Sequence, residues 1–166
     1  MTITCSPTSG FHHARYSEAG GFCTFNGLII AARKLIEQDR LANRVGILDL
    51  DMHWGDGTEQ IIGQIIEQLN LGSIDHYSFG KQGLKMQDIP SFLDHLAGRI
   101  CDTFKQCDLV IYQAGADPHI DDPLGGLMTT EQMRVRDKIV FNPTSTGNTR
   151  RMESRRRLPK RLLKNT

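Results

Sequence analysis

Long hydrophobic runs are missing from this sequence of 166 residues. No apolar stretch approaches the roughly 18 residues that a membrane span requires, and the opening MTITCSPTSG lacks the basic and then apolar plan of a secretion signal. These two absences predict a cytoplasmic protein without membrane contacts. Cysteines spaced as CxxC are also missing, so the four cysteines are expected to be reduced and mostly buried thiols.

Acidic residues are scarce at the carboxyl end. From Asn142 onward there are eight Lys or Arg and one acid, a net charge of +7, whereas the preceding 141 residues carry about −6. The change coincides with NPTSTGNT, whose turn-forming residues break any periodicity. We expect residues 1–141 to form one folded domain. Residues 142–166 are expected to be a basic, disordered or loosely helical tail, because its three leucines are too few to bury against so much like charge.

Short apolar runs alternate with helical patterns within the first 141 residues. The runs are short, rich in β-formers and not alternating, as buried strands are, although the third is weaker. In order they are ITCS (3–6), VGILDL (45–50), GSIDHY (72–77) and DLVIYQA (108–114). Apolar spacing predicts helices around 28–36, 61–69 and 92–104, and Thr129 can cap a last helix through Val140. The alternation predicts an α/β fold, a parallel sheet with helices on both faces.

Polar residues follow three of these strands, at the edge where ligands bind in open α/β sheets. ITCS leads to His12 and His13, VGILDL leads to DMHWGDG, and DLVIYQA leads to GADPHIDDP. Asp51 and His53 are two residues apart, so they point to the same side if the strand continues. With Asp117 they make three N/O ligands, which suit a zinc ion with an open position. A metal would also compensate the cost of burying these charges.

Each of these residues has a simpler interpretation when taken alone. A histidine at a strand end often only hydrogen-bonds the backbone, and Asp117 after Gly-Ala could cap a helix or form a turn. The convergence of independent strand ends favours the metal site over these interpretations. Asp49 and Asp56 would then remain for hydrogen bonds to the histidines.

Three segments, in this order, closely resemble the zinc-dependent histone deacetylase superfamily, which includes bacterial deacetylase-like amidohydrolases and acetoin utilisation proteins. They are SGFHHARYSEAGGFCTFNG, ILDLDMHWGDGT and QAGADPHIDDPLGG. The resemblance covers about residues 3–141 and implies the arginase/deacetylase-like fold in partial form. Since the family's fold begins before ITCS and continues beyond Phe141, the resemblance implies a truncated member.

By this resemblance the zinc ligands are Asp51, His53 and Asp117, and the tandem active-site histidines are His12 and His13. The implied reaction removes an acyl group from an acylated lysine or polyamine. Two carboxylate ligands cancel much of the charge with which zinc acidifies its water, so a separate base is needed. His13 is the expected general base and later acid, with His12 as its electrostatic partner.

The resemblance also assigns the surrounding residues. Asp49 and Asp56 match the aspartates that hydrogen-bond the first and the second of these histidines, respectively. Gly21, Phe22 and Cys23 match the segment lining the acyl-lysine tunnel, where Phe22 would border a narrow apolar slot. A potassium ion near the zinc is also implied, with the matching residues Asp49, Asp51, His53 and Ser73.

A tyrosine on a glycine-rich loop, which donates a hydrogen bond to the developing oxyanion, completes the family's site. No GGY occurs in this sequence, and Tyr16, Tyr77 and Tyr112 lie in other segments. Two functional classes stay open: a zinc hydrolase fragment with impaired activity, and a non-catalytic remnant or binding module that keeps the zinc pocket. Nucleic-acid binding is disfavoured, because the tail lacks stacking aromatics and a reading motif. Unpaired sheet edges would favour homo-oligomers.

Overall fold

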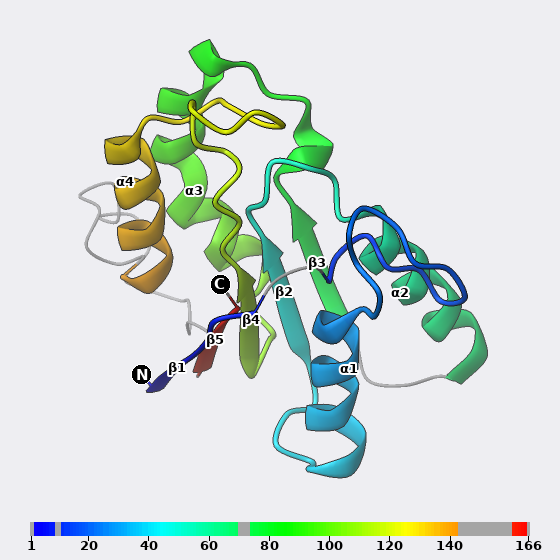
Figure 1. Cartoon of the computed structure of the whole chain (residues 1–166). Coiled ribbons are helices and arrows are strands. Elements are labelled where there is room, and N and C mark those ends of the chain that lie inside the picture. The colour runs from blue at the N-terminus through cyan, green and yellow to red at the C-terminus, as the bar shows by residue number, and fades with distance from the viewer. Residues whose placement is uncertain (1, 9–10, 70–73, 143–160, 166) are drawn as a thin grey trace.

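A computed structural model of the chain consists of a parallel sheet flanked by helices (Figure 1). It describes residues 2–8, 11–69, 74–142 and 161–165. The strands are β1 (Thr2–Ser6), β2 (Val45–Asp49), β3 (Ile74–Ser78), β4 (Leu109–Gln113) and β5 (Arg161–Asn165). They lie in the order β1-β5-β4-β2-β3, and each neighbouring pair is parallel.

The helices lie between the strands in sequence. They are α1 (Gly27–Arg33), the π-helical η1 (Lys34–Gln38), α2 (Asp56–Leu69), the 3-10 turns η2 (Gly80–Gln82) and η3 (Met86–Asp88), α3 (Ile89–Thr103) and α4 (Thr130–Phe141). Thr129 caps α4, as the sequence predicts, because its side chain accepts a hydrogen bond from the Gln132 amide. Within the described ranges, no helix has the length and apolarity that crossing a membrane requires.

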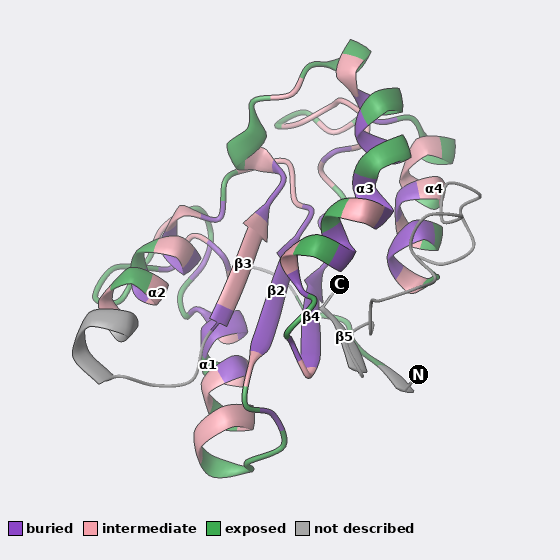
Figure 2. Cartoon of the chain, turned by 180° about the vertical axis from the view of Figure 1, so that it is seen from behind, coloured by how far each residue is buried: buried purple, intermediate pink, exposed green. Residues whose placement is uncertain are grey.

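Buried side chains divide between the two faces of the sheet. Leu48 and Tyr112 pack with residues of α3 and α4 on one face. Ile47 and Ile111 pack with residues of α1 and α2 on the other. All residues of β2 and β4 are buried, so these two strands form the centre of the fold (Figure 2). The predicted α/β fold, with a parallel sheet and helices on both faces, is confirmed.

The tail differs in part from the expectation. Residues 143–160 lie outside the described part of the chain, but Arg161–Asn165 form β5, which pairs with both β1 and β4. The expectation of a disordered or loosely helical tail is therefore wrong for these five residues. A strand between two neighbours satisfies its backbone amides and carbonyls on both sides, a gain that composition does not reveal.

The cysteines behave as expected. All four are free thiols, and Cys23, Cys101 and Cys107 are buried while Cys5 is exposed. Desolvation, followed by the neighbouring Asp75 carboxylate, raises the pKa of the Cys107 thiol to about 12. This thiol therefore stays protonated at neutral pH.

An ion pair joins β2 and β3 near their amino ends. Arg44 donates two hydrogen bonds of 2.7 Å to the Asp75 carboxylate, and the Cys107 thiol donates a third of 3.2 Å. Desolvation raises the pKa of Asp75, but the hydrogen bonds and charge of these partners outweigh it, so the pKa is lowered.

We predict that Asp75→Asn destabilises the chain in a pH-dependent way. A lowered pKa in the folded state gives stability that is present above the unfolded value of about 4 and is lost as the pH falls through the folded value. The variant should lose about 1–2 kcal/mol of unfolding free energy at pH 7 and much less at about pH 3. Urea unfolding at both pH values measures the difference. The exposed Asp94→Asn serves as control, and an equal loss at both pH values would contradict the prediction.

Candidate metal centre

Three residues that the sequence predicts as ligands come together at the carboxyl edge of the sheet. Asp51 and His53 lie in the loop after β2, and Asp117 lies in the loop after β4, the direct neighbour of β2. One ligand atom of each lies within 4.8 Å of the others. His53 Nδ1 is 2.7 Å from Asp117 Oδ2 and 3.4 Å from Asp51 Oδ1.

Backbone amides orient both carboxylates. The Met52 amide donates to Asp117 Oδ1 at 3.0 Å, and the His53 amide donates to Asp51 Oδ1 at 3.0 Å. The loop after β4 approaches closely because residue 115 is glycine: a Cβ on Gly115 would lie 2.6 Å from Asp51 Cα and 2.8 Å from Asp117 Oδ1. The site therefore depends on a close backbone contact between the two loops.

The electrostatics of the three residues fit a divalent cation. Burial, followed by the Asp51 carboxylate, raises the pKa of Asp117 to about 6. Desolvation lowers the pKa of His53. The hydrogen bond and charge of Asp117 and the charge of Asp51 outweigh this effect, so the pKa is raised above its usual value. Two carboxylates this close repel each other unless a proton or a cation lies between them. One imidazole and two carboxylates form a donor set that zinc accepts.

Two histidine–aspartate pairs accompany the three residues. His12 Nδ1 lies 2.8 Å from Asp49 Oδ2, and His13 Nδ1 lies 2.8 Å from Asp56 Oδ1. Both pairings expected from the sequence are therefore present. The two imidazoles are adjacent, with ring centroids 4.1 Å apart.

The two histidines have different surroundings. His12 is 5% exposed, and its Nε2 lies 3.6 Å from Asp51 Oδ1. Desolvation lowers the pKa of His12. The hydrogen bond to Asp49 and the charges of the nearby carboxylates outweigh this effect, so the pKa is raised above its usual value. The His13 side chain is 22% exposed and borders a hollow of about 250 Å³. Of the pair, His13 is the histidine that a small molecule in this hollow would reach.

Buried hydrogen bonds hold the segment that carries the histidines. The Thr58 amide donates to the His12 carbonyl at 2.9 Å. The Asn26 amide group donates to the Ala14 carbonyl and to Thr58 Oγ1, both at 3.0 Å. Asp56 is the first residue of α2, where the helix dipole favours a carboxylate. These contacts tie the histidine segment to the starts of α1 and α2.

Arg15 is a contact that the sequence did not predict. Its Nη2 donates to Asp56 Oδ2 at 2.7 Å, while His13 uses the other oxygen. Desolvation raises the pKa of Asp56. The hydrogen bonds from His13 and Arg15 outweigh this effect, so the pKa is lowered below its usual value. Asp56 is therefore ionised at neutral pH. The available signal was the place of Arg15 directly after the HHA motif.

The predicted tunnel segment packs beside His13. Gly21 has a positive φ of 50°, and a Cβ there would collide with the His13 ring. Cys23 is buried, whereas Phe22 is 97% exposed. A positive φ of 61° accompanies the outward position of Phe22. The described residues therefore do not enclose Phe22 in the narrow slot that the resemblance implied.

Ser73, matched by resemblance to a potassium ligand, lies outside the described residues. Ser78 is the residue of β3 that is in register with Asp49. It is buried, and its Oγ accepts a hydrogen bond from the Gly55 amide at 3.1 Å. Ser78 is therefore the serine that the sheet register places beside Asp49.

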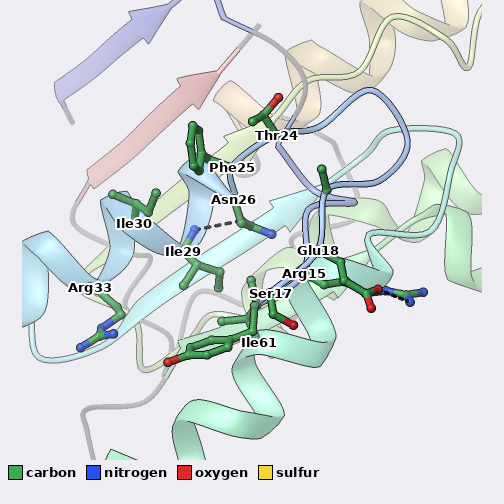
Figure 3. A pocket seen from close by; sticks show the side chains of 12 residues that line it. Arg15, Ser17, Glu18, Thr24, Phe25, Asn26, Ile29, Ile30, Arg33 and Ile61 are labelled. Atoms are coloured by element: carbon green, nitrogen blue, oxygen red, sulfur yellow. Dashed lines mark hydrogen bonds and ion pairs between the residues drawn. The ribbon is translucent and has the colours of Figure 1, made fainter.

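A larger hollow, of about 410 Å³, lies between the histidine segment, α1 and α2 (Figure 3). Arg15 and Asn26 line it together with apolar residues. Figure 3 shows the hydrogen bond that the Asn26 side chain accepts from the Ile29 amide. None of the three ligands of the candidate metal centre lines it. This hollow is thus separate from the candidate metal centre.

Comparisons with known proteins find similarity to histone deacetylases. The family profile of the histone deacetylase domain matches residues 2–79. An uncharacterised protein of Picosynechococcus sp. is 34% identical over 152 residues, which cover 84% of this chain and 50% of that protein. Histone deacetylase 19 of Arabidopsis thaliana is 27% identical over 146 residues, covering 74% of this chain and 28% of that protein.

A solved structure, an acetylpolyamine aminohydrolase from Burkholderia pseudomallei, has a similar fold. Its TM-score is 0.61 at 22% sequence identity, and the match covers 94% of this chain and 48% of that one. The chain thus spans about half the length of the Picosynechococcus protein and of this enzyme. From the family profile, the related sequences and the shared fold, we conclude that the chain belongs to the histone deacetylase superfamily.

Proposed function

We propose that the chain acts as a zinc-dependent amidohydrolase that removes an acyl group from an acylated lysine or polyamine. The main support is the meeting of Asp51, His53 and Asp117 beside two histidine–aspartate pairs. The names of its relatives, a histone deacetylase and an acetylpolyamine aminohydrolase, suggest the class of substrate. By the same resemblance, Asp49, Asp51 and His53 would hold a potassium ion together with Ser73, which lies outside the described residues.

Zinc on the three ligands would polarise the amide carbonyl and lower the pKa of a bound water. His13 donates its Nδ1 proton to Asp56 in this geometry, so its Nε2 lone pair is free to accept the proton of the attacking water. The protonated Nε2 can then return this proton to the leaving amine. Asp56, which Arg15 keeps ionised, stabilises the imidazolium between the two steps.

His12 has a complementary part in this proposal. It is buried, and the Asp49 carboxylate 2.8 Å from its Nδ1 would stabilise positive charge on its ring. A positive ring next to the metal ligands would stabilise negative charge as it develops on the carbonyl oxygen. His12 therefore acts as an electrostatic partner and Asp49 orients its ring through Nδ1.

The proposal is tested by measuring whether the chain hydrolyses an acetylated amine and whether this hydrolysis requires zinc. Zinc-loaded chain is incubated with an acetyl-lysine peptide and with an acetylated polyamine, and released amine is measured. We expect turnover that a chelator removes and added zinc restores. The rate should lie about a hundredfold to a thousandfold below that of relatives with an oxyanion donor, since one such hydrogen bond is worth that much. Turnover that persists without metal would reject the proposal.

A non-catalytic, zinc-holding binding module is the second candidate. The positions of the tyrosines favour it: Tyr112 donates to Asp137 at 2.6 Å, Tyr77 packs against the core that α3 and α4 cover, and Tyr16 is 63% exposed beside the larger hollow. None of the three tyrosines lines the hollow that His13 borders. One equivalent of bound zinc with no amine release would support this candidate over the hydrolase.

A further inference from the structure

A buried arginine lies beneath the two loops that carry the candidate ligands. Arg136, on α4, is 2% exposed. Its Nη1 donates to the backbone carbonyl of Leu50 at 3.2 Å and to that of Gly115 at 2.9 Å. Leu50 directly precedes Asp51, and Gly115 lies two residues before Asp117. One guanidinium therefore joins the ends of β2 and β4 where the ligands leave the sheet.

Two further residues fix this guanidinium from the other side. Arg136 Nε donates to Asp137 Oδ1 at 2.9 Å, and the buried Tyr112 hydroxyl donates to the same oxygen at 2.6 Å. A buried charge is tolerated only when it is paired and hydrogen-bonded. The planar guanidinium has donors at fixed angles, so one side chain can serve a carboxylate and two carbonyls together.

Packing alone does not explain a cation at this position. α4 already contacts the core through Ile139 and Val140, and apolar residues often replace buried ion pairs without loss of stability. The arginine instead binds two carbonyls in the loops of the candidate metal centre. Gly115 is so close to Asp51 that a Cβ would lie 2.6 Å from Asp51 Oδ2. A shift of the Gly115 carbonyl would therefore displace a ligand.

We propose that Arg136 is a positioning residue for the metal centre, which sets the separation of Asp51 and Asp117 by holding the carbonyls of Leu50 and Gly115. The inference rests on the proposed function, because it assumes that these carboxylates bind a metal. Substitution of Arg136 removes none of the three ligand side chains. Zinc affinity should nevertheless fall about tenfold to a hundredfold, the range typical of residues that orient metal ligands.

The test compares zinc dissociation constants, measured by competition with a chromophoric chelator, across three variants. Arg136→Met should bind zinc tenfold to a hundredfold more weakly than wild type. Arg136→Lys should be intermediate, because an ammonium group cannot serve both carbonyls and Asp137 at once. Arg134→Met removes an exposed arginine from the same helix and should leave the affinity unchanged. Visible absorption of the cobalt-loaded proteins should change in Arg136→Met, change less in Arg136→Lys and stay unchanged in Arg134→Met, since ligand geometry determines these bands.

A purely structural role would lower the melting temperature of metal-free Arg136→Met while leaving its zinc affinity and cobalt spectrum at wild-type values, and this result would overturn the proposal. If Arg136→Met does not fold, Arg136→Lys decides, and wild-type affinity in that variant would overturn it too. Failure of the wild-type chain to bind zinc would instead reject the metal centre and the proposed function. The two failures are therefore distinguishable.

Discussion

Alanine at Asp51 or Asp117 is expected to abolish stoichiometric zinc binding. Each substitution removes one of three ligands and leaves an imidazole and a single carboxylate. We expect zinc affinity to fall by more than about a hundredfold, beyond the effect typical of residues outside the ligand set. The measurement is zinc content after dialysis, together with chelator competition. An Asp51→Ala protein that retains a full equivalent of zinc would show that the ligand assignment is mistaken.

Stability supplies the matching control for these variants. Asp94→Ala, at an exposed position of α3, should keep wild-type zinc binding. Asp51→Ala and Asp117→Ala should stay close to wild type in metal-free stability, because relief of the repulsion between two adjacent carboxylates offsets the amide hydrogen bond that each variant loses. Loss of zinc binding without loss of metal-free stability would separate a ligand effect from unfolding. Residues kept for function at some expense of stability often behave in this way.

His13→Ala is expected to bring the turnover of zinc-loaded chain down to the background rate. The variant loses the group that accepts and returns the proton, and general acid–base catalysis contributes about a hundredfold to ten-thousandfold. Zinc binding should be retained, because His13 is not among the three candidate ligands. Amine release from an acetyl-lysine peptide and zinc content, measured on the same preparation, test both statements.

His95→Ala is the matched control for this experiment. His95 is an exposed histidine of α3 whose Nδ1 binds the Ser91 carbonyl at 2.7 Å, so its loss should not affect turnover. Undiminished turnover in His13→Ala would assign the proton transfer to another group. Turnover of the wild-type chain near that of relatives with an oxyanion tyrosine would show that a different residue donates to the oxyanion.

The core of the fold could be predicted because its strands are continuous apolar runs. VGILDL was expected at residues 45–50 and β2 is Val45–Asp49, while the weaker run at 72–77 became Ile74–Ser78. Ligand convergence followed from the rule that the carboxyl ends of parallel strands meet at one edge. Asp51 and Asp117 needed only the adjacency of β2 and β4, which alternating strands and helices favour.

Contacts between segments that are distant in the sequence could not be predicted in the same way. Arg136 is 86 residues from Leu50, and Arg15 is 41 residues from Asp56. Charged residues are usually exposed, so the position of Arg136 on α4 signals no such contact, and Arg15 offered only its place directly after the HHA motif. The outward position of Phe22 goes with a positive φ, which is uncommon for a residue with a side chain. β5 escaped prediction because its pairing partners, and not its composition, make it a strand.

The distance along the chain between His53 and Asp117 also bears on folding. They are 64 residues apart, yet their side chains are 2.7 Å apart in the folded chain. Closing a loop of that length in the unfolded chain costs roughly 4 kcal/mol in entropy, so unfolded protein should hold a metal at this pair of strand ends only weakly. A cation that binds the folded state alone would act as a reversible cross-link between β2 and β4. The melting temperature would then rise with free metal concentration, and a chelator would reverse the effect.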